Sequence, residues 1–193
     1  MTLILASTSS IRRAMLDAAG VACETMAPEV DESAAKEKPA DPREIALELA
    51  AAKALAVSRQ RLNDWVIGSD SVVSVDGRRF DKPADRDQAT QHLRAFSGKP
   101  MLLTSAVALA HGGAVDWRHS ETATLHVRPL SEQFIISYLD AEWPEVGYCV
   151  GVFRLEARGV QLFDRIDGDH FTILGMPLMS LLAALRERGL LLA

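Results

Sequence analysis

Hydroxyl and guanidinium groups are concentrated in residues 7–13, which read Ser-Thr-Ser-Ser-Ile-Arg-Arg. The segment lies between a short apolar stretch and an amphipathic one, so it is expected to begin a helix. A helix N-terminus offers unpaired N–H groups to a phosphate, and arginine binds phosphate oxygens in pairs. The hydroxyls of this segment, together with Arg12 and Arg13, are therefore candidate phosphate ligands, although helix-capping serines and solvated arginines are common. The glycines of a Walker loop or a dinucleotide fingerprint are absent.

Asp70 follows an apolar segment, Trp-Val-Ile-Gly-Ser at residues 65–69, that predicts a buried strand. Open α/β sheets bind ligands beyond the carboxyl ends of their strands. A carboxylate at such a position is ionised at neutral pH and can hold a divalent metal or orient a water molecule. The alternative is a turn aspartate that accepts hydrogen bonds from its own loop.

Four other charged residues have similar alternatives. Asp31 and Glu32 form an acidic pair that could bind magnesium or manganese through oxygen, or be solvated. Lys53 follows three alanines on an otherwise apolar helix face, which favours a nearby anion, whereas a snorkelling lysine is the commoner case. Lys82 precedes a proline turn, where a surface lysine is an equal alternative.

Other catalytic chemistries find little support in the sequence. The five histidines are scattered without zinc-ligand spacing, and neither a serine–histidine–acid set nor a cysteine–histidine pair is recognisable. Cys23 and Cys149 lie far apart in the chain, so we expect two reduced thiols in a cytoplasmic protein.

The elements that must position these residues alternate between strands and helices. Strands are expected at residues 3–6, 21–26, 65–70, 102–110 and 115–127, with residues 72–75 continuing in an extended conformation. Helices are expected at 11–19, from Pro42, from Asp85 to 97, at 131–140 and at 178–188. Asp41 is the expected N-cap of the second helix, and Asp76-Gly77 predicts a hairpin turn. Glu121 falls on the apolar phase of its strand, which an edge position or a function would equally explain. The pattern predicts an α/β fold with a mixed sheet.

Composition limits the kinds of partner. A chain of 193 residues that is 48% apolar suits one domain, or two lobes around a shared core, and we treat residues 1–193 as a single domain. The formal charge of −5 argues against nonspecific binding to nucleic acid. No apolar stretch reaches the ~20 residues of a membrane span, and the first residues lack the basic leader of a signal peptide. We expect no nucleic-acid or membrane partner.

Together, these segments resemble the Maf family of nucleotide pyrophosphatases over nearly the whole chain. Residues 5–13, Leu-Ala-Ser-Thr-Ser-Ser-Ile-Arg-Arg, look like the family signature Leu-Ala-Ser-x-Ser-Pro-x-Arg-Arg. Shorter matches follow in the family's order at Val30-Asp31-Glu32, Ala52-Lys53-Ala54, Ile67-Gly68-Ser69-Asp70, Asp81-Lys82-Pro83, Phe96-Ser97-Gly98, and from Asp167-Gly168 to Gly175-Met176-Pro177-Leu178. Their number and order are far more specific than any single match.

The resemblance implies an elongated α/β fold of the ITPase-like kind, in which helices flank a mixed sheet and two lobes surround a deep central cleft. It implies a nucleoside triphosphate substrate, a divalent metal cation (Mg or Mn) and often a homodimer. Asp70 would accept the proton of the attacking water, and Glu32 would assist with the water or, together with Asp70, with the metal. The residues implied to hold the triphosphate are Ser9, Arg12, Arg13, Lys53 and Lys82. Water would attack the α-phosphorus, and pyrophosphate would leave.

Three positions concern the choice of base, and here the sequence departs from the family pattern. The position that is often arginine in members acting on dTTP and UTP, and tryptophan in those acting on 7-methyl-GTP, is Ile11. Ser71 replaces the usual threonine or glutamine. The segment 152–156 looks closer to the 7-methyl-GTP branch and places Glu156 where that branch has its base-reading glutamate, which would accept hydrogen bonds from a guanine edge.

Two other classes of function compete with this interpretation. One is a nucleotide-binding regulator of cell division or septum formation that has lost turnover, and the intact Asp70 weighs against it. The other is a nucleic-acid-binding module, which the acidic charge disfavours.

Overall fold

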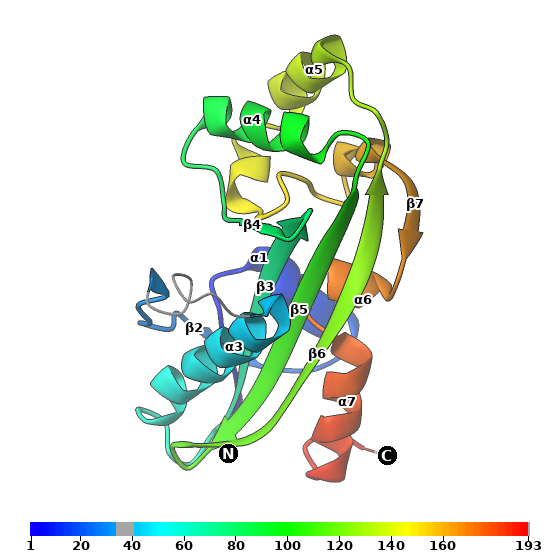
Figure 1. Ribbon diagram of the computed structural model, residues 1–193. Helices are drawn as coiled ribbons and strands as arrows, with labels where there is room; N and C mark the ends of the chain where they lie inside the picture. Colours follow the sequence, from blue (N-terminus) through cyan, green and yellow to red (C-terminus); the bar gives the residue numbers. More distant parts are fainter. Residues whose placement is uncertain (34–40, 193) are drawn as a thin grey trace. The chain divides into compact units, whose positions relative to one another are not determined.

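The computed structural model of the protein describes residues 1–33 and 41–192. Its elements, in chain order, are β1 (Leu3–Ala6), α1 (Ser10–Ala18), β2 (Glu24–Met26), α3 (Pro42–Ser58), β3 (Trp65–Val75), β4 (Arg78–Phe80), α4 (Arg86–Phe96), β5 (Pro100–His111), β6 (Ala114–Val127), α5 (Glu132–Glu142), the 3-10 helices η1 (Glu145–Tyr148) and η2 (Arg158–Leu162), β7 (Phe163–Asp167), α6 (His170–Ile173) and α7 (Leu178–Glu187) (Figure 1). None of the described helices is long and apolar enough to cross a membrane.

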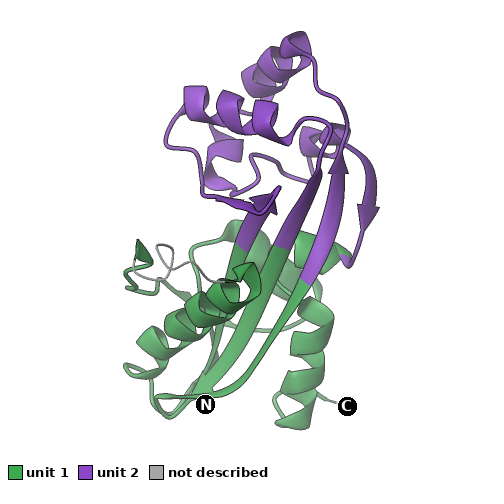
Figure 2. Ribbon diagram, in the orientation of Figure 1, with its two compact units in different colours: residues 1–71, 104–121, 170–193 green, residues 72–103, 122–169 purple. Residues whose placement is uncertain are grey.

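The described strands form one seven-stranded sheet in the order β2-β1-β3-β5-β6-β7, with β4 paired to β3. Parallel and antiparallel pairs both occur in it, which confirms the predicted α/β class with a mixed sheet. The chain divides into two compact units, and the division falls within the long strands β3, β5 and β6 (Figure 2). Unit 1 comprises residues 1–71, 104–121 and 170–193, and unit 2 comprises residues 72–103 and 122–169.

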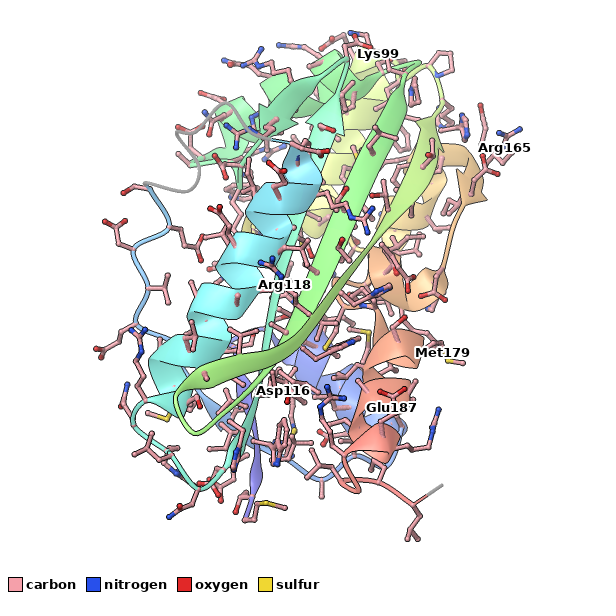
Figure 3. The ribbon with its side chains drawn as sticks, turned by 60° about the horizontal axis from the view of Figure 1, so that its bottom comes forward. Lys99, Asp116, Arg118, Arg165, Met179 and Glu187 are labelled. Carbon is pink, nitrogen blue, oxygen red and sulfur yellow. The ribbon has the colours of Figure 1, made fainter. Side chains whose placement is uncertain are left out.

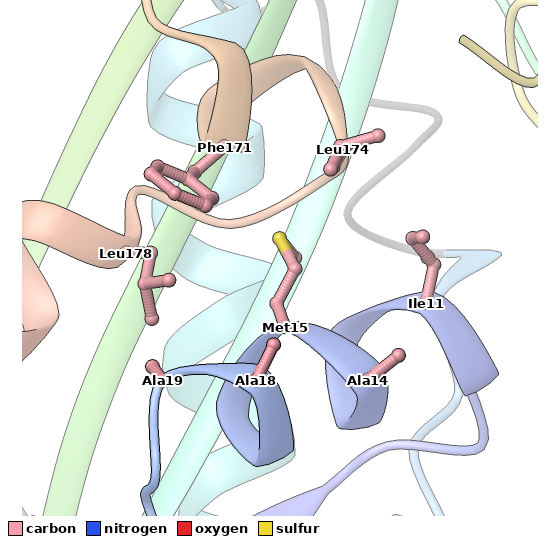
Figure 4. A pocket seen from close by; sticks show the side chains of 8 residues that line it. All are labelled: Ile11, Ala14, Met15, Ala18, Ala19, Phe171, Leu174 and Leu178. Atoms are coloured by element: carbon pink, nitrogen blue, oxygen red, sulfur yellow. The ribbon is translucent and has the colours of Figure 1, made fainter. Parts of the chain in front are cut away.

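In unit 1, β1 pairs in parallel with both β2 and β3. The register places Ala6 beside Met26 on one side and beside Gly68 on the other. Leu3–Ala6 is an entirely apolar strand, as expected where helices cover both faces of a parallel sheet. Helix α3 lies over one face, while α1 and α7 lie over the other (Figures 1 and 4). The loop after β1 and the β3 residues after Gly68 therefore leave the parallel pair at the same edge.

A hydrophobic cluster fills the space under α1 and α7. Leu5 and Ile67 from the strands meet Leu16 of α1 and Leu181 and Leu185 of α7, and all five are fully buried. Burying a leucine or isoleucine side chain contributes about 1.5–3 kcal/mol to stability. This packing holds α1, and the residues at its N-terminus, against the end of β1.

Gly68 allows α3 to lie unusually close to β3. A Cβ atom at Gly68 would lie 2.2 Å from the backbone oxygen of Ala50 and 2.6 Å from the backbone nitrogen of Ala54. Real Cβ contacts do not approach so closely, so any side chain here would push α3 away from the strand. The glycine thus sets the distance between this helix and the strand residues that follow Gly68.

The helix N-caps agree with the sequence. The side chain of Asp41 accepts a hydrogen bond from the Arg43 backbone nitrogen, and Asp85 accepts one from the Gln88 nitrogen at 2.8 Å. Ser9 and Ser131 cap α1 and α5 in the same way. These contacts satisfy backbone N–H groups that have no partner inside the helix, and so fix where each helix begins.

Glu121 anchors α6 and α7 to β6 within unit 1. Its carboxylate accepts hydrogen bonds from Thr172 Oγ1 at 2.9 Å and Ser180 Oγ at 2.8 Å, and lies 3.0 Å from His119 Nε2. Burial raises the pKa of Glu121, but the hydrogen bonds from Ser180, Thr172 and His119 together outweigh it and leave the pKa below its usual value. Glu121 therefore has a structural role, which explains why an acid occupies an otherwise apolar position of its strand.

The C-terminal end of α7 is also tied to β6. Arg188 Nε pairs with Asp116, and Arg188 Nη1 lies 3.6 Å from Glu187. Figure 3 labels Asp116 and Glu187 on these two elements. The anchors at Glu121 and Arg188 hold α7 along the strand at two separate points.

Unit 2 contains the predicted hairpin between β3 and β4. Asp76 and Gly77 both have positive φ, of 51° and 74°, as the tight hairpin turn requires. Phe80 of β4 packs edge-on against Phe96 of α4, with ring centroids 4.8 Å apart. Helices α4 and α5 belong to the same unit, where Arg94 and Glu132 form an exposed ion pair of 2.6 Å.

Two strands differ from the sequence expectation. Residues 21–23 do not belong to a strand, and β2 contains only Glu24–Met26. The strand Phe163–Asp167 was not predicted, because its partly exposed residues carry no alternating apolar pattern. It pairs antiparallel with residues 124–127 of β6 through backbone hydrogen bonds, which need no particular side chain.

Candidate active site

A lysine between two carboxylates is the centre of the polar cluster in unit 1. Lys53 Nζ lies 2.5 Å from Asp70 Oδ1 and 2.7 Å from Glu32 Oε1. The three residues come from α3, β3 and the segment after β2, so segments far apart in the sequence meet here. One ammonium group therefore neutralises much of the repulsion between two acidic side chains.

Asp70 and Lys53 are largely withdrawn from water, whereas the Glu32 side chain is 32% exposed. Asp70 is 7% exposed, and the Lys53 side chain is 13% exposed. Buried charges are expensive to desolvate, and a buried ion pair is therefore weak evidence for stability alone. Charged groups held in such surroundings are instead typical of a functional site.

Asp70 occupies a different part of its strand from the one expected. The sequence predicts that the strand ends near Asp70, but β3 continues to Val75. The parallel partner β1 ends at Ala6, opposite Gly68, so Asp70 lies two residues beyond the last parallel pair. The predicted position of Asp70 at the end of its strand is therefore wrong, because the hairpin with β4 extends β3 beyond the parallel pairing.

Asp31, the neighbour of Glu32, has a local role. Its Oδ1 accepts hydrogen bonds from the Ser33 hydroxyl at 2.6 Å and the Ser33 backbone nitrogen at 3.0 Å. The hydroxyl and backbone hydrogen bonds lower the pKa of Asp31. Of the acidic pair, Glu32 is the residue that contacts Lys53.

Arg12 points toward β3 and the turn before α7. Its Nε donates to the Gly175 carbonyl at 2.9 Å, and its Nη2 donates to Ser71 Oγ at 3.1 Å. Burial lowers the pKa of Arg12, while the negative charges of Asp70 and then Glu32 oppose that shift. The guanidinium is thus electrostatically coupled to Asp70 and Glu32. Its two hydrogen bonds to Gly175 and Ser71 use only two of its five N–H donors.

Ser9 and Arg13 are the other two predicted ligands near α1. Ser9 Oγ accepts a weak hydrogen bond of 3.4 Å from the Arg12 backbone nitrogen, which leaves the hydroxyl proton able to donate. Arg13 Nε donates to Asp17 at 2.8 Å, and Arg13 Nη1 donates to the Cys23 carbonyl. The structure therefore brings Arg12, but not Arg13, into contact with the turn at Gly175.

Ile11, a predicted specificity residue, lines an apolar pocket of about 330 Å³ in unit 1 (Figure 4). The pocket lies between α1 and the segment from α6 to α7, and its other lining residues are Ala14, Met15, Ala18, Ala19, Phe171, Leu174 and Leu178. Ser71, the second predicted specificity residue, accepts a hydrogen bond from Arg12.

Two of the predicted site residues, Lys82 and Glu156, belong to unit 2. The charges of both affect the pKa of the Cys149 thiol. Burial raises the pKa of the Cys149 thiol, Glu156 adds to the rise, and Lys82 and Arg154 oppose it. Lys82 and Glu156 are both exposed. Two residues far apart in the sequence are therefore electrostatic neighbours of the same thiol within this unit.

Glu32 and Asp70 are also the candidate ligands of a divalent metal. Within residues 1–33 and 41–192, no group of three or more histidine, cysteine, aspartate or glutamate side chains is placed to hold a metal ion. Glu32 and Asp70 nevertheless converge on one cation, the ammonium of Lys53. Because Mg²⁺ is usually bound by one or two carboxylates together with substrate phosphates, this donor set fits a metal that arrives with a triphosphate.

The Gly175 carbonyl and Ser69 belong to the site but were not predicted as its ligands. Ser69 Oγ lies 2.9 Å from the Gly175 oxygen and 2.8 Å from that of Ala106, and Ser69 is fully buried. Gly175 has φ of 108°, and a Cβ there would lie 3.4 Å from Arg12 Nε. The only signal in the sequence was that Gly175 belongs to the motif Gly175-Met176-Pro177-Leu178. A contact made by a backbone carbonyl does not depend on the type of side chain, so side-chain patterns do not predict it.

Comparison with known proteins extends over nearly the whole chain. A family model described as Maf-like protein matches residues 2–188. The chain is 46% identical over 191 residues to a 7-methyl-GTP pyrophosphatase of Rhizobium meliloti (strain 1021), covering 97% of this chain and 96% of the relative. It is 45% identical over 195 residues to a nucleoside triphosphate pyrophosphatase of Sphingopyxis alaskensis, covering 98% of each.

Among solved structures, a nucleoside-triphosphatase / dITP/XTP pyrophosphatase from Mycobacterium abscessus has a TM-score of 0.40 and 19% identity, covering 67% of this chain and 76% of that one. A HAM1 protein from Coxiella burnetii has a TM-score of 0.43 and 14% identity, covering 65% and 72%.

Proposed function

The chain belongs to the Maf-like protein family, and from that premise we propose that it hydrolyses nucleoside triphosphates to the monophosphate and pyrophosphate. Relatives at 44–46% identity over nearly their full length are named nucleoside triphosphate pyrophosphatase or 7-methyl-GTP pyrophosphatase, which supports this reaction. The proposal combines that kinship with the cluster of charges in unit 1.

The observation that carries the proposal is the contact of Lys53 with both Asp70 and Glu32. We assign Asp70 as the acceptor of the proton from the attacking water. Its burial limits competition from bulk solvent, and its charge is held in place by Lys53. A positioned carboxylate acting as general base contributes about 10²–10⁴-fold to a rate.

The positive groups would hold the negatively charged triphosphate. Arg12 presents further N–H donors beside Asp70, and the Ser9 hydroxyl lies at the N-terminus of α1, where the helix dipole favours anions. Lys53 would turn from the carboxylates toward a phosphate oxygen when substrate binds. Arg13 and Lys82 complete the proposed set. Arg13 would exchange its hydrogen bond to Asp17 for one to a phosphate oxygen. Lys82 is exposed and would exchange contacts with solvent for contact with a phosphate.

A divalent cation, Mg or Mn, would be held by Glu32 and Asp70 with phosphate oxygens of the substrate. When bound, it would supply charge neutralisation for the leaving pyrophosphate and lower the pKa of a bound water. Asp70 would still receive the proton, while Arg12 and Lys53 would stabilise the negative charge that develops on the phosphates.

Base selection is assigned to Glu156, with Ile11 and Ser71 as the other two candidates. An exposed carboxylate such as that of Glu156 accepts hydrogen bonds from the N–H groups of a guanine edge. Relatives named 7-methyl-GTP pyrophosphatase recur among the similar proteins, so we place 7-methyl-GTP among the candidate substrates.

The test is a panel of 7-methyl-GTP, UTP, dTTP and modified triphosphates, each titrated with Mg²⁺ and with Mn²⁺ while pyrophosphate release is measured. We expect release from at least one triphosphate and none after chelation of the metal. Tight nucleotide binding without release from any substrate would contradict the enzymatic proposal and would favour the regulator.

A further inference from the structure

Behind Arg12, two hydrogen-bonded serine hydroxyl groups, those of Ser71 and the buried Ser105, run into the core of unit 1. Ser71 Oγ, which accepts from Arg12 Nη2, lies 2.8 Å from Ser105 Oγ. Ser105 Oγ in turn lies 2.7 Å from the Thr172 carbonyl oxygen. Ser105 and Thr172 are both fully buried, so water does not compete for these hydrogen bonds.

The direction of each hydrogen bond follows from counting protons. A serine hydroxyl has one proton, and a carbonyl oxygen has none. The Ser105 proton must therefore point to the Thr172 carbonyl, and Ser71 must donate its proton to Ser105. The Gly175 oxygen, 3.3 Å from Ser71 Oγ, is a second acceptor for this proton, but the 2.8 Å contact with Ser105 is shorter and would otherwise set the lone pairs of two oxygens against each other. With its proton directed to Ser105, Ser71 turns lone pairs toward Arg12.

We propose that Ser105 is a positioning residue for Arg12, acting through the hydroxyl of Ser71. Ser105 fixes the proton of Ser71, so that Ser71 offers Arg12 Nη2 only an acceptor, while the Gly175 carbonyl accepts from the neighbouring Nε on the same edge of the guanidinium. The remaining N–H donors of Arg12 are thereby aimed in one direction. This inference rests on the proposed function, in which Arg12 holds the triphosphate.

The segment that supplies both carbonyls is itself held in place. Thr172 donates to Glu121, and the Gly175 oxygen also lies 2.9 Å from the buried hydroxyl of Ser69. Ser105 therefore joins Arg12 to a fixed backbone segment rather than to a free loop. The proposal also changes the expected role of Ser71: it affects the phosphates through Arg12 rather than reading the base directly.

The experiment is a double-mutant cycle on kcat/KM with Ser105→Ala, Arg12→Lys and the combined variant. Ser105→Ala should lower kcat/KM about tenfold, the size expected for one hydrogen bond in a preorganised site. In the Arg12→Lys background the same substitution should have almost no effect, because the planar guanidinium that it positions is gone. The ranking of bases should not change in any of these variants.

Two further variants serve as controls. Ser58→Ala also removes a fully buried serine hydroxyl in unit 1, one that accepts from the Gly113 nitrogen, and its effect should be the same in the wild-type and Arg12→Lys backgrounds. If Ser105→Ala does not fold, Ser71→Ala breaks the same chain at a less buried position and should show the same coupling to Arg12. If Ser105→Ala and Ser71→Ala have equal effects in the wild-type and Arg12→Lys backgrounds, the proposal is overturned.

A parallel cycle on the affinity for a non-hydrolysable triphosphate analogue separates this inference from the proposed reaction. Turnover with additive effects would refute the positioning role alone. Coupled effects on binding without any turnover would refute the proposed reaction alone. Absence of both turnover and analogue binding in the wild-type protein would overturn both.

Discussion

Three acidic side chains of unit 1, Asp31, Asp70 and Glu121, have different environments. Asp31 accepts hydrogen bonds from Ser33, and Glu121 accepts hydrogen bonds from residues of α6 and α7. Asp70 forms an ion pair with the Lys53 ammonium. Only the last contact joins an acid to a cation that a phosphate can draw away. Similar residue types therefore carry either structure or chemistry according to whether their partners can be exchanged for substrate.

Replacing Asp70 by asparagine should lower kcat by about 10²–10⁴-fold, because the amide cannot accept the proton of the attacking water. Triphosphate affinity should be retained or tighter, since one negative charge is removed beside the phosphates. The measurement is steady-state pyrophosphate release together with calorimetric binding of a non-hydrolysable analogue.

Asp140→Asn is the matched control. Asp140 is an exposed aspartate that pairs with Arg86, and losing such a surface pair has little effect. Its kcat should stay at the wild-type value. Turnover in Asp70→Asn comparable to that of this control would remove Asp70 as the base.

Glu156→Gln should change the order of preferred bases more than the rate with the best substrate. A carboxylate accepts hydrogen bonds at both oxygens, whereas the amide presents a donor at one of them, so a guanine edge should lose more than other bases. Competition between paired triphosphates would measure the ranking. Glu145→Gln removes a charge from the same unit as a control, and an unaltered ranking in Glu156→Gln would refute the assignment.

At the scale of elements, the close packing of α3 on β3 positions Lys53 against Asp70. Gly68 makes this possible, because it has no Cβ to meet the Ala50 carbonyl. On the opposite face, the hydrophobic cluster packs α1 and α7 against the sheet, and Glu121 connects α7 to β6. The site therefore depends on packing on both faces of the sheet in unit 1.

Gly68→Ala should reduce the free energy of unfolding by about 1–3 kcal/mol or more, because the added methyl overlaps backbone atoms of α3. It should also reduce activity in the folded fraction, since α3 carries Lys53. Urea unfolding and kcat/KM measure the two effects.

Gly20→Ala separates overlap from backbone strain. Gly20 has φ of 71°, and no atom lies within 4 Å of an added Cβ, so the substitution strains the backbone without crowding it. We expect it to be destabilised by about 1–2 kcal/mol with normal activity. Activity in Gly68→Ala equal to that in Gly20→Ala would contradict the proposed role of the α3–β3 distance.

Glu121→Gln should lower stability by about 1–3 kcal/mol, since the amide nitrogen would face hydroxyl groups that now donate to the carboxylate. The pKa of Glu121 is below its usual value in the folded state. Its contribution is therefore present above the unfolded-state pKa of about 4.3 and is lost as the pH falls through the folded-state pKa. Urea titrations across the acid range and up to neutral pH should show the difference from wild type shrinking only in acid.

Glu187→Gln changes an exposed glutamate of α7 and should match the wild-type protein throughout the pH series. A destabilisation of Glu121→Gln that stays constant to the acid end of that series would contradict the assignment of Glu121 as a charged anchor.

Elements with local signals were predictable from the sequence. The Asp41 cap, the Asp76-Gly77 turn and the apolar strand at residues 3–6 each depend on residues close together in the chain. The position of Arg12 depends instead on a buried serine inside the apolar run of β5 and on two backbone carbonyls. Such contacts depend on tertiary structure and have no side-chain pattern, so Ser105 and β7 could not be predicted.

At the scale of the whole molecule, the predicted site residues are divided between the two compact units. Unit 1 contains Ser9, Arg12, Arg13, Glu32, Lys53 and Asp70, with Ile11 and Ser71, whereas unit 2 contains Lys82 and Glu156. The residues proposed for chemistry thus lie mainly in unit 1, and the main candidate for base recognition lies in unit 2. The deep cleft and the homodimer stay predictions, and light scattering in solution would measure the oligomeric state.

In the proposed reaction, water activated by Asp70 attacks the α-phosphorus of a nucleoside triphosphate. Hydrolysis in ¹⁸O-labelled water, with Mg²⁺ or Mn²⁺, followed by mass spectrometry of both products, shows which phosphorus is attacked. We expect equal amounts of nucleoside monophosphate and pyrophosphate, with one ¹⁸O atom in the monophosphate and none in the pyrophosphate. Label in the pyrophosphate, or formation of a nucleoside diphosphate and inorganic phosphate, would contradict this reaction.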